Sequence, residues 1–485
     1  MTGHERSYDL LFRDVDIIDG TGGKIRRGDV GVIDDRIVAI GDLSTTGARR
    51  EITGNGLALA PGFIDVHTHD DALALNGNPM EPKLTQGVTT VIVGNCGISL
   101  SPLKPGSPLP PPLNIIGDSD DYRFPTFRKY VEALETRPPA LNVAPMVGHS
   151  TLRVAVMDRL DRPATSSEIA AMEILLQEAL DSGAIGLSTG LYYPPAREAP
   201  PGEVLALLMR LAPSGAVYTT HMRNEDDFLE ESLRESFETA KAANVPLIIS
   251  HHKCMGRRNH GLSHRTLKMF DEVRKTQEVG LDAYPYTAGS SALLPEMVEQ
   301  CERVLITWST PHPEHNGRDL AQVAKEWDCS ITDAIDRLLP AGAVYFHMAE
   351  DDVRRIVSYP HTMIGSDGLP RGARPHPRLW GTFPRVLGRY ARDLKLMSIE
   401  RAVHKMTALA AETFRLSDRG RIAEGHFADL VLFDPKSVID TATYEAPETR
   451  AAGIRMVVVN GTVLLEDGKI HKLRPGKVIR RAATT

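Results

Sequence analysis

The stretch APGFIDVHTHDD, residues 60–71, joins an apolar run to two histidines and two aspartates. Pro61-Gly62 is typical of an entry turn, and the apolar pair that follows is typical of a strand interior. Side chains alternate between the faces of a strand, so Asp65, His67 and His69 point the same way. Two imidazoles therefore converge at a strand end. In isolation this pattern fits a pair of buried core histidines as well as a metal site, so the rest of the chain decides.

Eight short β-rich runs, the first of them in that stretch, alternate along the chain with amphipathic helical segments. Apolar residues recur three and four apart most clearly in SEIAAMEILLQEALDSG and DDFLEESLRESFETAKAAN. Eight strands alternating with helices over roughly 350 residues predict an α/β fold, a (β/α)8 TIM barrel. The runs are 63–69, 89–96, 142–149, 184–189, 217–222, 246–253, 279–286 and 362–368.

Both ends of the chain have a different sequence pattern, which predicts short strands with alternating apolar residues, separated by Gly/Asp turns. Each end is too small to form a good core alone, so we expect the two to pair into one small β-sandwich or β-barrel domain. The expected division is 7–61 and 415–480 for the two parts of the β domain, and 62–414 for the barrel.

Two intervals are too long for simple connections. Residues 97–141 contain the Pro-rich SPLKPGSPLPPPLN and are interpreted as an extended loop over the barrel mouth, with a disordered linker as the alternative. Residues 287–361 separate the seventh and eighth runs and include helical pieces such as GRDLAQVAKEW. We expect an inserted lid segment at 287–345, because long loops at the mouth usually serve the site.

Composition excludes several classes of protein. A formal net charge of -7, with both signs interspersed, argues against a nucleic-acid partner. No stretch approaches the ~20 apolar residues of a membrane span, and the start MTGHERSYDLLFRD lacks a signal peptide's apolar core. We therefore expect a cytoplasmic protein with no membrane partner. Four cysteines without a CxxC do not indicate a disulfide framework.

Side chains that can bind a metal gather where the predicted strands end. In a barrel of this type the chemistry lies at the carboxyl ends of the strands. Five of the eight strand ends carry such residues, and chance placement of this set is improbable. The candidates are His67 and His69 on the first strand, Cys96 on the second, His221 on the fifth, His251 on the sixth and Asp367 on the eighth.

The donor types indicate zinc. Imidazole and thiolate suit Zn²⁺, whereas Mg²⁺ or Ca²⁺ requires an oxygen-only set. A catalytic zinc has about three protein ligands and keeps one position for water, whose pKa it lowers to about 7. Six candidates are more than the three protein ligands of one catalytic zinc. Either two metals share the site, or some of these residues contact the ligands without binding the metal.

Several motifs together resemble one known family. They are PGFIDVHTHDD, VTTVIVGNCGIS, MVGHSTLR, THMRNE, ISHHK, DAYPYTAGS, IGSDGLP and HPRLWGTFPRVLGRY. These blocks run nearly from end to end, and they resemble the D-aminoacylases (N-acyl-D-amino-acid deacylases) of the amidohydrolase superfamily. The resemblance implies a zinc hydrolase whose barrel carries a small β domain built from both termini.

The resemblance also implies roles for the strand-end residues. A tightly held zinc is expected at Cys96, His221 and His251, and a weaker second position at His67 and His69, which Cys96 can bridge. Many binuclear members of the superfamily use a carboxylated lysine from the fourth strand, but AIGLSTG contains no lysine. Cys96 is expected to replace it, and one working zinc is the simpler interpretation.

Asp367 follows the apolar run TMIG at the end of the eighth strand. A free carboxylate beside an activated water can take a proton during attack and return it to the departing amine. The local SDG context alone fits a turn or a helix cap. The whole constellation and the resemblance favour Asp367 as general base and acid.

An N-acyl amino acid presents a carboxylate, so its recognition calls for cations. Lys253 lies two residues beyond His251 and shares its face if the strand continues. Arg378 could supply a two-pronged clamp, and Tyr284 offers a hydroxyl. The resemblance assigns binding of the substrate carboxylate to Lys253, Tyr284 and Arg378. The alternatives are a surface lysine, a structural salt bridge and a core tyrosine.

Other polar residues receive smaller expected roles. Asp65 is expected to orient a ligand imidazole from outside the metal. His252 is expected to be structural, because it faces away from its neighbour His251. His149 ends the third run and is a weaker candidate for the pocket lining.

The expected reaction is zinc-dependent hydrolysis of a small-molecule N-acyl-D-amino acid to a carboxylate and a free D-amino acid. Preference for the D-enantiomer rests on the resemblance alone, since no spacing reveals handedness. Leu293 and Leu294 favour a neutral side-chain pocket. The alternatives are a deacylase specific for N-acyl-D-glutamate or N-acyl-D-aspartate, another amidohydrolase such as a cyclic-amide hydrolase or an unusual dipeptidase, and a non-catalytic scaffold, which lost ligands would mark.

Overall fold

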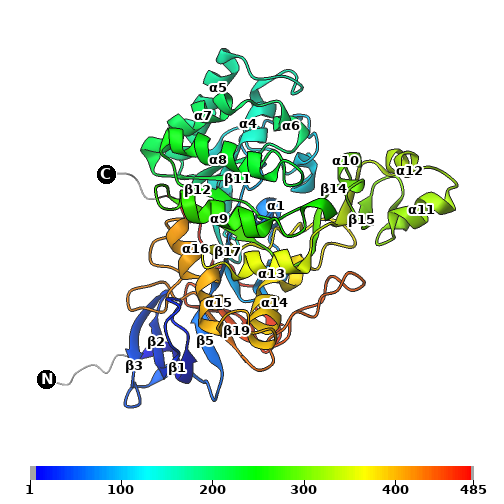
Figure 1. Cartoon of the computed structure of the whole chain (residues 1–485). Helices are drawn as coiled ribbons and strands as arrows, with labels where there is room; N and C mark the ends of the chain where they lie inside the picture. The colour runs from blue at the N-terminus through cyan, green and yellow to red at the C-terminus, as the bar shows by residue number, and fades with distance from the viewer. Residues whose placement is uncertain (1–6, 482–485) are drawn as a thin grey trace.

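The computed structural model describes residues 7–481, and its central feature is a barrel of parallel strands (Figure 1). All neighbouring pairs in the two strand paths, β6-β7-β8 and β9-β10-β11-β12-β13-β17, are parallel. β8 and β9 are successive pieces of one strand, and a bridge between Thr68 and Gly368 joins the last strand to the first. The expected eight-stranded barrel is therefore confirmed. Its strands are β6 (Phe63–Asp65), β7 (Val88–Val93), β8 (Asn142–Pro145) with β9 (Val147–Gly148), β10 (Gly186–Gly190), β11 (Val217–His221), β12 (Leu247–Ile249), β13 (Val279–Ala283) and β17 (Thr362–Ile364).

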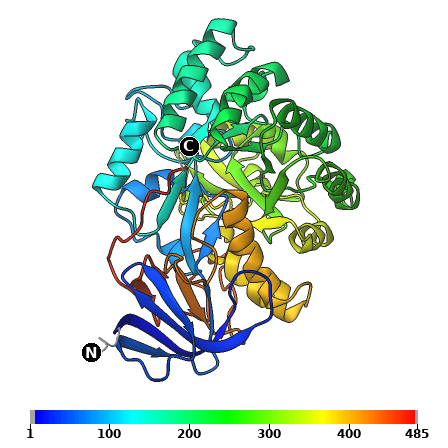
Figure 2. The ribbon, with the colours of Figure 1, turned by 90° about the vertical axis from the view of Figure 1, so that its left-hand side faces the viewer.

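Helices surround the barrel and cover its outer face (Figure 2). α5 begins with a capping box, in which the Glu168 amide donates to the Thr165 hydroxyl and the Thr165 amide donates to the Glu168 carboxylate. No helix within residues 7–481 combines the length and the apolar character needed to cross a membrane. The longer helices are α3 (Phe127–Thr136), α4 (His149–Val156), α5 (Ser166–Asp181), α7 (Pro201–Leu211), α8 (Leu229–Ala243), α9 (Ser263–Val273), α13 (Glu350–Ser358), α14 (Arg378–Arg385) and α15 (Ile399–Met406). The shorter ones are α1 (Asp71–Leu75), α2 (Glu81–Leu84), α6 (Pro194–Arg197) and α16 (Ala408–Thr413).

Apolar side chains from successive strands fill the barrel interior, among them Ile64, Ile92, Ile185 and Ile248. The strands are buried on both faces, which explains why VTTVIV of β7 reads as a continuous strand-forming run without alternation. A packed interior leaves the chemistry to the strand ends and the loops that follow them.

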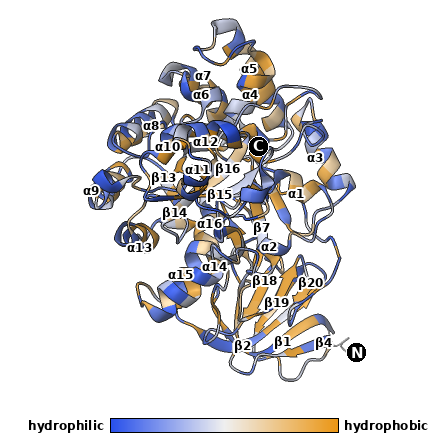
Figure 3. Ribbon diagram, turned by 90° about the vertical axis from the view of Figure 1, so that its right-hand side faces the viewer, coloured by the Kyte–Doolittle hydropathy of each residue, from blue (hydrophilic) through white to orange (hydrophobic). Residues whose placement is uncertain are grey.

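The two ends of the chain form one sheet beside the barrel (Figure 2). Its order is β21-β20-β19-β18-β5-β1-β2-β3, with β4 also paired to β1. The antiparallel pairing of β5 with β18 joins the N-terminal and C-terminal halves. Apolar side chains from both halves share a core, and Figure 3 shows hydrophobic residues along the strands of this sheet. We propose domain limits at 7–61, 62–414 and 415–480. The strands are β1 (Tyr8–Ile17), β2 (Arg26–Ile33), β3 (Arg36–Gly41), β4 (Ala48–Thr53), β5 (Ala58–Pro61), β18 (Leu430–Phe433), β19 (Ile454–Val459), β20 (Thr462–Glu466) and β21 (Lys469–Ile470).

The segment between β13 and β17 contains a small unit with its own apolar core, which projects from the barrel at the right of Figure 1. The sequence indicated only its helical pieces, but the structure adds a three-stranded antiparallel sheet of order β14-β16-β15. Ion pairs Arg197–Glu296 and Arg257–Glu302 hold this insertion against barrel loops. Its elements are β14 (Ala288–Ala292), α10 (Pro295–Val298), β15 (Arg303–Ser309), η4 (Pro313–His315), α11 (Leu320–Glu326), α12 (Ile331–Leu338) and β16 (Ala341–Phe346).

Residues 97–141 differ in part from the expected extended loop. Their Pro-rich part is irregular apart from the short turn η1 (Leu113–Ile115), but Leu103 and Leu113 are buried in the main core. The segment then forms α3, whose apolar face was not singled out in the sequence. A loop anchored by buried leucines is a part of the fold and not a linker.

Candidate metal centre

The six strand-end candidates converge at the carboxyl end of the barrel. His67 and His69 follow β6, Cys96 follows β7, His221 ends β11, and the other two follow β12 and β17. Three of the residues turn the chain with a left-handed backbone: φ is 52° at Cys96, 36° at His251 and 48° at Asp367. Non-glycine residues rarely adopt this conformation, and its repeated use at strand ends is typical of functional sites.

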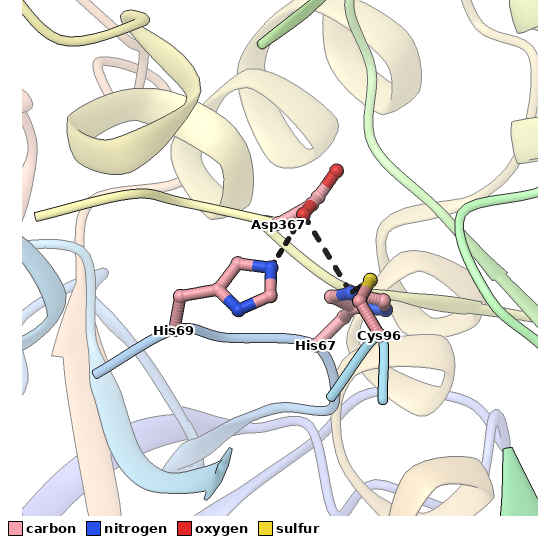
Figure 4. A group of neighbouring side chains, drawn as sticks. All are labelled: His67, His69, Cys96 and Asp367. Atoms are coloured by element: carbon pink, nitrogen blue, oxygen red, sulfur yellow. Dashed lines mark hydrogen bonds and ion pairs between the residues drawn. The ribbon is translucent and has the colours of Figure 1, made fainter. Parts of the chain in front are cut away.

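Two overlapping groups of metal-ligating atoms form at this point. One contains His67, His69, Cys96 and Asp367 (Figure 4), and the other contains Cys96, His221 and His251. Within each group the ligand atoms lie within 4.8 Å of one another. The Cys96 sulfur lies 3.2 Å from His67 Nε2 and 3.3 Å from His251 Nε2. Cys96 is thus shared by both groups, which is the arrangement expected for a bridging thiolate.

The imidazoles are oriented from outside by carboxylates. Asp282 lies 3.4 Å from His67 Nδ1 and accepts the backbone amide of His251 at 2.9 Å. Glu225 lies 3.1 Å from His251 Nδ1 and 3.5 Å from His221 Nε2. Engagement of one ring nitrogen leaves the other facing the centre. In agreement, the buried His221 Nδ1 has no hydrogen-bond partner within residues 7–481, so this donor set fits a zinc ion.

Neither Asp282 nor Glu225 was singled out from the sequence. Asp282 lies in the seventh run, where the strand-end rule could have found it. Glu225 lies in the loop after β11, where no period constrains side-chain direction. Asp65 is expected to orient an imidazole, but among the described residues its carboxylate binds Lys83 Nζ at 2.8 Å and accepts backbone amides, including that of Ser366. Asp65 instead ties the first strand to the eighth.

Asp367 is surrounded by cationic and imidazole groups. Its carboxylate lies 2.9 Å from Arg378 Nη1 and 3.2 Å from His69 Nε2. Burial alone would raise the pKa of Asp367, but the Arg378 guanidinium and the neighbouring imidazoles outweigh it and hold this pKa well below its usual value. The backbone amide of Asp367 donates to His67 O at 2.8 Å, which fixes the carboxylate at the barrel closure.

The predicted carboxylate-binding residues surround one aromatic ring. The Arg378 guanidinium lies 4.4 Å, and the Lys253 ammonium 6.0 Å, from the centroid of Tyr284. Both cations already have acidic neighbours: Lys253 Nζ donates to Glu225 at 2.7 Å, and Arg378 pairs with Asp367. Arg378 Nε is buried and has no partner within the described part of the chain. The Nε donor of this guanidinium is therefore unused.

His149 and His252, for which the sequence predicts smaller roles, have hydrogen-bond partners outside the metal centre. His149 lies 2.9 Å from Glu203 and shares that carboxylate with Arg153 in a buried network. His252 Nε2 lies 2.9 Å from the Thr266 hydroxyl, on the helix side of the strand. Two tyrosines that the sequence did not predict at the site lie beside His221. The His221 ring centroid is 4.8 Å from that of Tyr193 and 5.7 Å from that of Tyr192.

Comparisons with known proteins agree with this geometry. A model of the amidohydrolase family matches residues 50–465. The chain is 51% identical over 476 residues to a D-aminoacylase of Alcaligenes xylosoxydans xylosoxydans, with 98% of each protein covered. The chain belongs to the D-aminoacylase family of amidohydrolases. An N-acyl-D-aspartate deacylase of the same organism is 47% identical, covering 97% of this chain and 95% of the relative.

Solved members of the D-aminoacylase family share the whole fold. A D-aminoacylase studied for its binuclear metal centre, with activation by one metal and attenuation by a second, matches with a TM-score of 0.95 and 50% identity, covering 98% of this chain and 100% of that one. An N-acyl-D-glutamate deacylase of Bordetella bronchiseptica, complexed with zinc and a phosphonate inhibitor, matches with a TM-score of 0.93 and 44% identity over the same shares. The two overlapping ligand groups of this chain suit such a centre.

Proposed function

We infer that this chain is a metal-dependent deacylase, which hydrolyses N-acyl-D-amino acids to a carboxylate and a free D-amino acid. The observation that carries this conclusion is the shared position of Cys96 between two groups of ligand atoms within a D-aminoacylase fold. Zinc is the proposed metal, with the tight position at Cys96, His221 and His251. His67 and His69 form the weaker position.

The donor set supports a Lewis acid role. A zinc ion bound there supplies positive charge that activates water and polarises the amide carbonyl. Asp367 is the proposed base, because its carboxylate stays ionised and lies 3.2 Å from His69 and 3.6 Å from His67. It takes the proton of the attacking water and delivers it to the amine as the C–N bond breaks. Without that proton the amine is a poor leaving group.

The substrate carboxylate is proposed to bind among Lys253, Tyr284 and Arg378. The free Nε of Arg378 supports this assignment, since a guanidinium can bind a carboxylate through two donors. Binding there fixes the Cα of the substrate relative to the metal, and this fixed relation is how the site selects one enantiomer. Localisation in the cytoplasm is likewise a proposal.

The buried cations favour a neutral substrate side chain. Recognition of a D-glutamate or D-aspartate side chain calls for a further cation beyond Lys253 and Arg378, which are assigned to the α-carboxylate. Among residues 7–481, the buried cations other than Lys405 pair with a carboxylate, and Lys405 donates to backbone carbonyls at the end of α13 and the start of β17. The pairs are Lys83–Asp65, Arg153–Glu203, Lys253–Glu225, Arg378–Asp367 and Arg419–Asp429.

The leucines expected to line the pocket do not support this preference. Leu293 is buried in the core of the insertion with Met297 and Ile306, so its side chain stabilises that unit. Leu294 is only partly buried and packs against the same core.

The test is hydrolysis of matched N-acetyl-D and N-acetyl-L forms of methionine, leucine, glutamate and aspartate, with zinc measured on the same protein. We expect cleavage of the D forms, with methionine and leucine preferred, and loss of activity in Asp367→Asn with its zinc retained. Cleavage of L forms only would refute the assignment. Preference for D-glutamate or D-aspartate would indicate a deacylase specific for acidic side chains instead of neutral ones. Hydrolysis of dihydrouracil in place of linear amides would indicate a cyclic-amide hydrolase.

A further inference from the structure

A second cluster of metal-ligating side chains lies in the insertion, outside the strand-end centre. His312, Glu314 and His315 lie in the turn between β15 and α11, and their ligand atoms lie within 4.8 Å of one another. The proposed deacylation uses none of them. We propose that these three residues form a separate binding site for a divalent transition metal, such as Zn²⁺ or Ni²⁺.

The turn itself brings the two imidazoles together. Residues 313–315 form the 3₁₀ turn η4, and in such a turn residues three apart lie above one another. His312 and His315 are three apart, and their ring centroids are separated by 6.0 Å. The carboxylate of Glu314 lies between them: its Oε1 is 3.0 Å from His312 Nδ1 and 3.7 Å from His315 Nε2. Two nitrogens and one oxygen therefore face a common point.

An aromatic wall holds both rings in place. The indole of Trp327 lies 4.8 Å from each imidazole centroid, with His315 meeting it edge-on. His315 is buried, whereas about a third of the His312 side chain is exposed. One side of the cluster is thus closed by protein and the other is open for water ligands. Because packing already limits the motion of His315, a metal needs to order less of the site on binding.

The donor types indicate the class of ion. Two imidazoles with one carboxylate suit Zn²⁺, Ni²⁺, Co²⁺ or Cu²⁺, while Ca²⁺ and Mg²⁺ need more oxygen ligands. The hydrogen bond from His312 lowers the pKa of Glu314, so this carboxylate is ionised at neutral pH. An ionised carboxylate supplies the negative charge that a divalent ion requires.

Arg318 competes with the metal. Its Nη1 lies 3.3 Å from His315 Nδ1, and the same guanidinium pairs with Glu326. Arginine can only donate, so this contact keeps the imidazole proton on Nε2, the nitrogen that faces Glu314. Metal binding at Nε2 must move that proton to Nδ1, toward Arg318. Removal of the guanidinium is therefore expected to tighten binding.

Equilibrium dialysis against Ni²⁺ tests the site, with enzyme that carries one zinc per chain, at the strand-end centre. We expect wild-type protein to bind one Ni²⁺ per chain more than His312→Ala and His315→Ala, whose affinity falls at least about tenfold for each lost ligand. Glu314→Gln weakens binding, and Arg318→Gln strengthens it. His264→Ala removes an exposed histidine on α9 and is the matched control, with nickel binding unchanged.

Trp327 supplies an independent optical readout. Bound Ni²⁺ should quench its fluorescence along the same saturation curve, and Trp327→Phe should abolish the quenching. Thermal unfolding of each variant checks that the insertion still folds, and added Ni²⁺ should raise the Tm of wild type but not of His315→Ala. Equal nickel binding by wild type, His312→Ala and His315→Ala would overturn the proposal, as would quenching that does not saturate or that persists in Trp327→Phe.

Discussion

Asp367 and Arg378 form a buried ion pair in which Oδ2 and Nη1 are 2.9 Å apart. The proposed proton carrier and the proposed carboxylate clamp are therefore in direct contact. A substrate carboxylate that binds the free Nε of this guanidinium shares its charge with Asp367. If both proposed roles hold, substrate recognition and proton transfer are coupled through the Arg378 side chain.

Replacement of Arg378 by Gln should change the pH profile as well as the rate. Loss of the guanidinium should raise the pKa of Asp367, whose ionised form is the proposed base. The acidic limb of kcat/KM should move to higher pH. Loss of a charged hydrogen bond to substrate should also lower kcat/KM about 100-fold at neutral pH. Arg374→Gln, on the exposed part of the same loop, is the control. An acidic limb that stayed in place or moved to lower pH would contradict the coupling.

The amount of bound zinc should depend on Cys96 more than on His69, because Cys96 belongs to both groups of ligand atoms. Cys96→Ala removes a ligand from both groups, so the protein should lose nearly all bound zinc after dialysis. His69→Ala affects only the weaker position and should retain one zinc per chain. Elemental analysis of the purified variants measures both, with Cys301→Ala as a control for thiol loss. A Cys96→Ala protein that still held one zinc would show that the imidazoles alone form the tight position.

Asp282 should act on the metal without touching it. It lies 3.4 Å from His67 Nδ1 and accepts the His251 amide, so Asp282→Asn weakens the orientation of two imidazoles. Such changes typically cost 10- to 100-fold in metal affinity or activity. Competition with a zinc chelator measures the affinity. If zinc affinity and kcat are both unchanged, Asp282 serves only the barrel closure.

Glu203 should contribute stability that depends on pH. Burial works against its ionisation, but the hydrogen bond with His149 and the ion pair with Arg153 lower its pKa to about 2, compared with 4.5 when unfolded. A lowered carboxyl pKa stabilises the fold above pH 4.5, and this stability is lost as the pH falls toward 2. Glu203→Gln should cost about 3 kcal/mol at pH 7, since Arg153 loses its partner.

Urea unfolding between pH 7 and pH 3 measures this effect. The variant should lose less stability than wild type as the pH falls, because the ionisable carboxyl is gone. Glu198→Gln, an exposed neighbour in sequence, should follow the wild-type curve. A parallel loss in wild type and Glu203→Gln would rule out this carboxyl as the source.

The barrel was predictable from the sequence because its strands keep their apolar character and their spacing. The convergence of Cys96, His221 and His251 followed from one rule, that parallel strands present their carboxyl ends at the same face. No such rule constrains loops. Glu225 contacts two imidazoles and Lys253 from a loop without periodicity, so only the folded structure reveals its role.

In the insertion, by contrast, the sequence contains a strand signal that the prediction does not include. VLITW and AVYF in residues 303–346 have the composition of strands, but the helical pattern of α11 is the clearer signal in this segment. The sequence predicts a pocket role for Leu293, which follows β13 in the chain. In the structure β14, β16 and β15 form a sheet, and Leu293 packs in the apolar core of the insertion.

The pairing of β5 with β18 has a consequence for biosynthesis. β5 precedes the barrel and β18 follows it, so a chain emerging from the ribosome presents the open edge of β5 until almost all of the protein has been made. Unpaired strand edges attract other strands. Truncation or stalled translation after the barrel should therefore yield nascent chains that associate through the β5 edge, whereas in the finished protein β18 covers that edge.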